Sequence, residues 1–143
     1  MNAIRPSLFL QRALALDAAG SLALAALQLI VPAPLARTFQ LPDALLLATG
    51  AFLCAYAALL LWMRQAAVVP AWLVRLVIVG NVGWGISCLG LPLLGVLQPA
   101  FWGWDYLIFQ AGAVLLFAVL EAKGLQQSQP AAIRVPAAVP AHD

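Results

Sequence analysis

Four long apolar runs, separated by short connections that contain proline, dominate this chain of 143 residues. A helix needs about 20 mainly apolar residues to cross a bilayer. We therefore predict membrane-spanning helices at 8–31, 44–63, 71–94 and 101–120. Hydrophobic residues make up 65% of the chain and charged residues 8%, far from the balance of a soluble domain. The predicted fold is all-α, a polytopic four-transmembrane-helix bundle that forms one domain over residues 1–124.

Prolines and one glycine mark the expected ends of these helices. Pro32 and Pro34 follow the first run, and a proline cannot continue a helix interior. We expect Gly124 to cap the fourth helix, because glycine readily adopts the left-handed conformation at a helix end. Residues 125–143 are rich in glutamine, alanine and proline and lack apolar periodicity. We interpret them as a disordered cytoplasmic tail.

The basic residues predict how the chain lies in the membrane. Six of the seven fall on one side of the predicted spans, namely Arg5, Arg12, Arg64, Arg75, Lys123 and Arg134. Only Arg37 falls on the other side. Because basic residues accumulate in cytoplasmic segments, both termini should be cytoplasmic, in a multi-pass protein of the cell inner (plasma) membrane. A clustered basic patch is lacking, so we expect no nucleic-acid partner.

Polar residues inside the apolar runs are the candidate site. A charged side chain such as Asp17 costs about 2.5–3.5 kcal/mol at the centre of a membrane helix on insertion scales, so it needs a reason to be there. At 1.5 Å per residue, Asp17 and Asn81 lie at depths that agree within about one turn. We predict a ligand-binding or proton-coupling cavity in the inner half of the bundle, lined by Asp17, Ser21, Asn81, Trp84 and Gln110. The same residues could instead only hold helices together.

Several further expectations concern packing. The first and third predicted helices should contact each other directly along their polar faces, with Arg75 as a possible partner of Asp17. Glu121 is interpreted as an ordinary solvated helix end beside Lys123. We expect an aromatic belt, with Trp102, Trp104 and Tyr106 at the outer interface and Trp62 and Trp72 at the inner one. The first helix also has a small-residue stripe that suits close approach to another helix of the bundle or to another subunit, namely Ala15, Ala19, Ala23 and Ala26.

The residues that usually carry catalysis or ligate metals are scarce. The single histidine, His142, lies near the C-terminus, and Lys123 is the single lysine. Cys54 and Cys88 are isolated, without a Cys-x-x-Cys pattern. Glycine loops that cradle phosphate and metal-ligand clusters are also lacking. We therefore expect no catalytic residue, no metal, no cofactor and no enzymatic activity.

Short motifs in three of the runs resemble small four-helix bacterial integral membrane proteins of unknown function. The residues concerned are Leu16, Asp17, Ala18 and Ser21, then Asn81, Trp84 and Ser87, and finally Gln110 with the segment 121–125. The resemblance covers residues 8–125 and implies a fold and a membrane location without an activity. Small multidrug transporters share the size and helix count, but Asp17 stands where they have glutamate, and the surrounding aromatic pattern differs.

Two functions follow as hypotheses. The first is a non-enzymatic membrane protein that binds a small amphipathic or lipid-like ligand in the inner-half cavity, or that docks as an accessory subunit in a membrane complex. The alternative is a proton-coupled small-solute transporter that uses Asp17 and works as a dimer. The expected partners are the lipid bilayer, a hydrophobic small molecule, and further copies of the chain or a larger complex.

Overall fold

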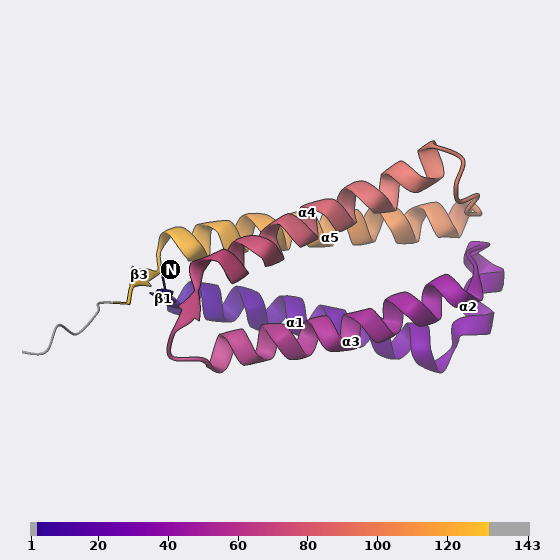
Figure 1. The fold of residues 1–143 in the computed structure, drawn as a ribbon. Coiled ribbons are helices and arrows are strands. Elements are labelled where there is room, and N and C mark those ends of the chain that lie inside the picture. The colour runs from indigo at the N-terminus through magenta and orange to yellow at the C-terminus, as the bar shows by residue number, and fades with distance from the viewer. Residues whose placement is uncertain (1–2, 132–143) are drawn as a thin grey trace, which may run out of the picture.

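The computed structural model describes residues 3–131, and it contains four helices that are long and apolar enough to cross a membrane (Figure 1). The elements in chain order are β1 (Ala3–Arg5), α1 (Leu8–Ile30), α2 (Pro32–Phe39), α3 (Asp43–Gln65), β2 (Val69–Pro70), α4 (Ala71–Leu93), α5 (Phe101–Gln126) and β3 (Gln129–Pro130). The predicted fold class, an all-α bundle of four spans, is confirmed. These features are those of a multi-pass membrane protein.

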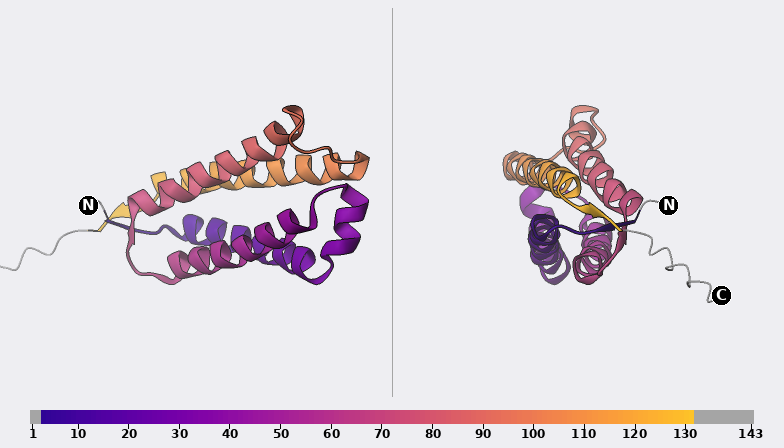
Figure 2. Two further views of the ribbon diagram at one scale, coloured as in Figure 1. Left: turned by 45° about the vertical axis from the view of Figure 1, so that its right-hand side comes forward. Right: turned by 90° about the vertical axis from the view of Figure 1, so that its left-hand side faces the viewer.

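The long helices form two antiparallel hairpins that lie side by side (Figure 2). Helix α1 packs along α3, α4 packs along α5, and α1 also contacts α5. In the end-on view, α1 and α4 occupy opposite corners of the bundle. The predicted direct contact between the first and third spans is made by side chains, since their polar faces meet at Asp17 and Asn81, but the two helices do not pack along each other. Leu14 and Ala18 on the buried face of α1 lie in an apolar core to which both α3 and α4 contribute, and Asn81 of α4 reaches Asp17 nearer the centre of the bundle.

The apolar core is concentrated near the end of the bundle where the chain begins. There the fully buried side chains include Leu10 and Leu14 from α1, Leu60 and Met63 from α3, and Val74 from α4. Smaller apolar clusters lie toward the opposite end, around Leu46 and around Leu107. The bundle is thus packed at both ends, and the candidate site lies between them.

Three very short strands tie the helices together at the core end. Strand β1 pairs antiparallel with both β2 and β3, so the start of the chain, the α3–α4 connection and the segment after α5 meet in one sheet. Ser7 adds to this junction: its Oγ accepts from the backbone N–H of Leu10 at 3.1 Å and donates to the carbonyl oxygen of Gly124 at 3.0 Å.

This junction corrects two sequence-based expectations. Gly124 does not cap α5, which continues to Gln126; instead it lets α1 approach, since a Cβ added at Gly124 would lie 2.7 Å from Leu10 Cα. The segment 125–143 was expected to be a disordered tail, yet its first residues complete α5 and form β3. Residues 132–143 lie outside the part of the chain that the structure describes.

The opposite end of the bundle holds a helix that the sequence analysis did not predict. Pro32 and Pro34 were interpreted as stop signals, but proline also fits the first turn of a helix, where its missing N–H costs nothing. Helix α2 starts at Pro32 and ends before Gln40, which has a positive φ of 52°. The backbone N–H of Ala100 donates to the Phe39 carbonyl at 2.9 Å, so α2 is fastened to the start of α5.

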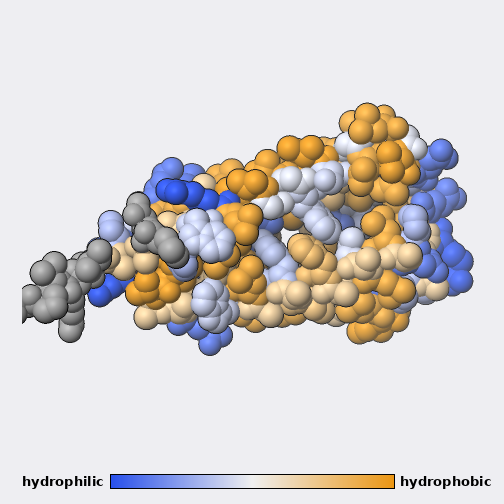
Figure 3. Space-filling model, in the orientation of Figure 1, coloured by the Kyte–Doolittle hydropathy of each residue, from blue (hydrophilic) through white to orange (hydrophobic). Residues whose placement is uncertain are grey.

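The surface has the pattern of a protein surrounded by lipid. Apolar residues cover most of the long face in Figure 3, and hydrophilic residues gather at its two ends. Trp62, Trp72 and Trp102 are all more than half exposed, as ring positions in an aromatic belt would be. Ala19, Ala23 and Ala26 are also exposed, so the predicted small-residue stripe does not pack within the bundle.

Candidate functional site

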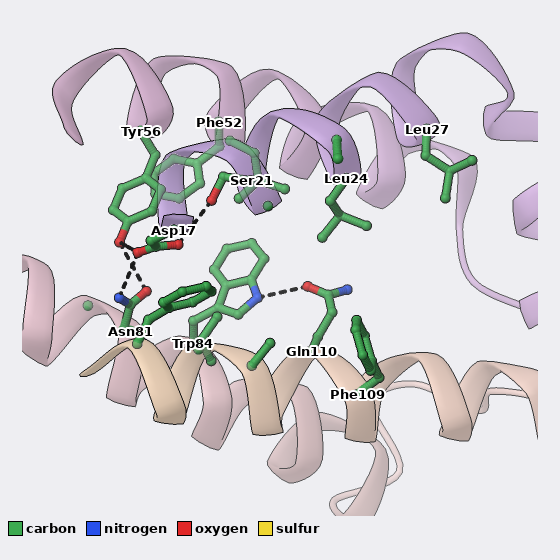
Figure 4. A pocket seen from close by; sticks show the side chains of 17 residues that line it. Asp17, Ser21, Leu24, Leu27, Phe52, Tyr56, Asn81, Trp84, Phe109 and Gln110 are labelled. Carbon is green, nitrogen blue, oxygen red and sulfur yellow. Dashed lines mark hydrogen bonds between the residues drawn. The ribbon is translucent and has the colours of Figure 1, made fainter. Parts of the chain in front are cut away.

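A cavity of about 550 Å³ lies between the two hairpins, and all four long helices contribute to its wall (Figure 4). All five residues of the predicted site line it: Asp17, Ser21, Asn81, Trp84 and Gln110. Most of the remaining wall is made by leucine, phenylalanine and other apolar side chains. The geometry therefore brings the predicted set together around one space.

Asp17 and Asn81 meet across the bundle, as predicted from their depths. The Asn81 Nδ2 group donates to Asp17 Oδ2 at 3.1 Å, and Ser21 Oγ, one turn further along α1, donates to Asp17 Oδ1 at 3.3 Å. Asp17 is 2% exposed and Asn81 is 4% exposed. The α1 carboxyl is therefore held inside the bundle, away from lipid.

Tyr56 of α3 is a member of this cluster that the sequence analysis missed. Its Oη lies 2.8 Å from Asp17 Oδ2 and 3.1 Å from Asn81 Oδ1. A tyrosine in the middle of a membrane span needs a partner for its hydroxyl, and that requirement was the available signal. Tyr56 links the α1–α3 hairpin to α4.

Glu121 is the second residue that the sequence analysis misjudged. It is not a solvated helix end: it is fully buried, and its Oε2 accepts from Asn81 Nδ2 at 3.2 Å. Its other oxygen, Oε1, is buried without a hydrogen-bond partner in the described part of the chain. The cause is the longer α5, which continues beyond residue 120 and packs against α1 where Gly124 allows close approach. One amide thus joins the carboxyls of Asp17 and Glu121.

Within the part of the chain that the structure describes, neither carboxyl contacts a cation. The hydrogen-bond partners of Asp17 are the neutral side chains of Ser21, Tyr56 and Asn81, and the partner of Glu121 is Asn81. Every lysine and arginine in residues 3–131 is exposed, which includes Arg75, the partner that the sequence had suggested for Asp17. Within the same residues, no group of three or more His, Cys, Asp or Glu side chains could hold a metal ion.

Aromatic rings form one wall of the cavity beside the polar cluster. Phe52 stacks on Trp84 with 5.7 Å between ring centroids and on Tyr56 with 6.1 Å. Trp84 Nε1 donates to Gln110 Oε1 at 3.1 Å, which fixes both side chains. Figure 4 shows the hydrogen-bonded cluster at one end of the cavity and Leu24 and Leu27 at the other. The cavity is therefore amphipathic along its length.

A second polar cluster lies nearer to α2 and lines a smaller pocket. Gln28, fully buried on α1, donates through Nε2 to Tyr106 Oη at 2.5 Å and accepts from Thr49 Oγ1 at 3.1 Å. Tyr106 also stacks on Phe39 with centroids 4.6 Å apart. Tyr106 is thus partly buried inside the bundle, unlike the belt position that its spacing suggested.

No protein-family model, curated protein or solved structure matches this chain. The resemblance to small bacterial membrane proteins stays a prediction, and the function must be argued from the cavity.

Proposed function

We propose that this protein binds a small amphipathic or lipid-like molecule in the cavity between its hairpins, without catalysing a reaction. The observation that carries the proposal is the division of the cavity into a hydrogen-bonded polar end at Asp17 and Asn81 and an apolar end at Leu24 and Leu27. Its volume of about 550 Å³ is within the range of about 300–1,000 Å³ typical of ligand pockets. An elongated molecule with one polar head would match both ends.

A purely structural role for the polar residues would not require this space. Polar side chains that only hold helices together support close packing, because association in lipid depends on van der Waals contact between helices. Here α1 and α4 are joined across the bundle through Asn81, while the space beyond that contact stays open. This contrast favours a bound molecule over packing alone.

The location is part of the same proposal. We place the protein in a bacterial inner membrane with the sheet end and both termini in the cytoplasm. Arg5, Arg64 and Lys123 lie near that end of the helices, which agrees with the positive-inside rule. Reporter fusions after residue 131 and in the 94–100 connection test it. Activity of a cytoplasm-only reporter in the connection would contradict the orientation.

Native mass spectrometry of the protein in lipid nanodiscs tests the binding proposal directly. We expect the wild type to retain an added mass of a few hundred daltons. Ala113→Trp places a large side chain in the cavity wall and should abolish that mass, whereas the control Val119→Trp, at an exposed α5 position outside the cavity, should keep it. A ligand-free wild type, or a ligand that survives Ala113→Trp, would contradict the proposal. Co-purification of another membrane protein would instead support the accessory-subunit version.

A proton-coupled transporter is the second candidate, and the observation that favours it is the buried carboxyl of Asp17 in the cavity wall. Four short helices seldom enclose a full transport path, so such a transporter should be a dimer. Asp17→Asn should then abolish pH-dependent solute binding and leave the fold intact. A monomer, or an unchanged pH response in that variant, would remove this candidate.

A further inference from the structure

The close polar contacts around Asp17 outnumber the hydrogens that its neutral partners supply. Three side chains contribute donors: Ser21 has one hydroxyl hydrogen, Tyr56 has one, and the Asn81 amide has two. These four hydrogens face five close polar contacts: Ser21 with Asp17, Tyr56 with both Asp17 and Asn81, and Asn81 with both Asp17 and Glu121. Four hydrogens cannot fill five contacts one by one, so either one hydrogen is shared between two acceptors or a carboxyl supplies a fifth.

The position of that hydrogen follows from the acceptors. Tyr56 Oη faces Asp17 Oδ2 and Asn81 Oδ1, which are both acceptors when Asp17 is ionised. If Asp17 carries a proton on Oδ2, it donates to Tyr56, and Tyr56 donates to Asn81. Turning the amide by 180° would place its oxygen against both carboxyls, and each would then need a proton. With the Asn81 Nδ2 group toward the carboxyls, one protonated carboxyl gives every contact its own hydrogen.

Among residues 3–131, no cation lies beside the pair to compensate its charge. The titratable side chains in the cluster are Asp17 from α1, Tyr56 from α3 and Glu121 from α5; α4 contributes only the neutral amide of Asn81. The lysines and arginines of residues 3–131 are all exposed. Two like charges in a buried, amide-bridged pair repel each other strongly, so the pair favours a state with at most one negative charge.

We infer that Asp17 and Glu121 share a proton in the empty cavity, and that the cationic head group of an amphiphile binds at this pair and displaces it. The inference rests on the proposed function and specifies its ligand class as lipophilic ammonium compounds. Asp17 lines the cavity and would meet the head group, whereas Glu121 acts from behind Asn81 as a positioning residue. Before binding, the pair carries one negative charge and one proton. After binding, it carries two negative charges beside the cation, and the proton has moved to water, so the charges balance.

The cavity wall beside Asp17 suits a quaternary ammonium group. Trp84, Phe52 and Tyr56 form a continuous stack of aromatic rings next to the carboxyl, and aromatic rings attract cations that are removed from water. The apolar end at Leu24 and Leu27 would hold an alkyl chain. One ligand can therefore satisfy the charge, the rings and the apolar end together.

Titration calorimetry in phosphatidylcholine nanodiscs tests the inference, with empty nanodiscs subtracted. The probe is decyltrimethylammonium, which carries no dissociable proton, so any proton released comes from the protein; decanol and decyl sulfate are the uncharged and anionic controls. Measurements in two buffers of different ionisation enthalpy give the number of protons. We expect release of about one proton per bound cation at neutral pH, none with decanol, and no binding of decyl sulfate.

Three variants test whether the carboxyl pair, and no other acid, binds the cation and releases the proton. Glu121→Gln should still bind the cation but release almost no proton, because the like charge that favours a shared proton is then removed. Asp17→Asn should weaken cation binding by about tenfold or more. Asp105→Asn, at an exposed acid outside the cavity, should match the wild type. Infrared spectroscopy of the wild type provides a readout that does not depend on a variant's folding: a carbonyl band of a protonated carboxyl should be present in the empty protein and disappear with decyltrimethylammonium.

The outcomes distinguish the two proposals. Binding of decanol and the cation without proton release, or the absence of the protonated-carboxyl band, would overturn the shared proton and leave the amphiphile-binding function standing. Binding of decanol or decyl sulfate without binding of the cation would overturn the ligand class alone. If no amphiphile binds, the proposed function fails and the inference fails with it.

Discussion

Replacement of Gly124 by alanine should loosen the contact that sets the distance between α1 and α5. The added Cβ would lie 2.7 Å from Leu10 Cα and 2.9 Å from Leu10 Cβ, and a backbone atom cannot rotate away. Forcing an extra methyl into packed structure costs about 1–3 kcal/mol, and the backbone contact places this case near the upper figure.

A matched glycine on the same helix provides the control. A Cβ at Gly112 meets nothing within 4 Å, so Gly112→Ala should gain up to about 1 kcal/mol of helix propensity without a clash. Equilibrium unfolding in mixed micelles, followed by tryptophan fluorescence and circular dichroism, measures both variants. We expect Gly124→Ala to be less stable than Gly112→Ala by about 3 kcal/mol. Equal stabilities would refute the reasoning that α1 and α5 touch at this point.

Three further perturbations test the cluster and the surface. Asn81→Leu loses contacts with three side chains and should lower the free energy of unfolding by about 2 kcal/mol, at about 0.6 kcal/mol per contact. The control Ser87→Ala loses only a bond within α4 and should change that free energy by less than about 0.5 kcal/mol. Equal losses in the two variants would contradict the bridging role of Asn81. Tyr56→Phe keeps the ring but should cost about 1 kcal/mol in the same unfolding assay; an unchanged stability would show that the hydroxyl bonds are not made. A lipid-soluble maleimide should label the exposed Cys54 much faster than the buried Cys88, as read by peptide mass spectrometry, and equal rates would contradict the packing of α4 against α5.

The spans could be predicted because lipid leaves few options for an apolar run. The first three predicted helices end within two residues of α1, α3 and α4, since hydropathy and proline decide those ends. The fourth was predicted six residues too short, because Glu121 and Lys123 read as the polar end of a span. Helix α2 was missed because Pro32 signals either the end of one helix or the start of the next, and only tertiary contacts with α5 decide between them.

The site could be predicted in part for a similar reason. Helical spacing and depth place Asp17 near Asn81, and that contact needs no knowledge of which helices are neighbours. Tyr56 and Glu121 were missed because their roles depend on the arrangement of the hairpins. A diagonal placement of α1 and α4 opens the centre of the bundle, so that α3 and α5 can each contribute a side chain to the same amide. Local sequence does not encode that arrangement.

The small sheet at one end of the bundle has a consequence for biogenesis. Because β1, β2 and β3 lie together, the segments before α1, between α3 and α4, and after α5 meet at the same face, and each hairpin enters and leaves the bilayer there. In the proposed orientation, residues 31–42 and 94–100 are the connections that cross the apolar core. The first of these segments carries Arg37 as its single charged residue and the second carries none. Each hairpin can therefore insert as a unit at little electrostatic cost, and the sheet then joins the two halves after both have entered the membrane.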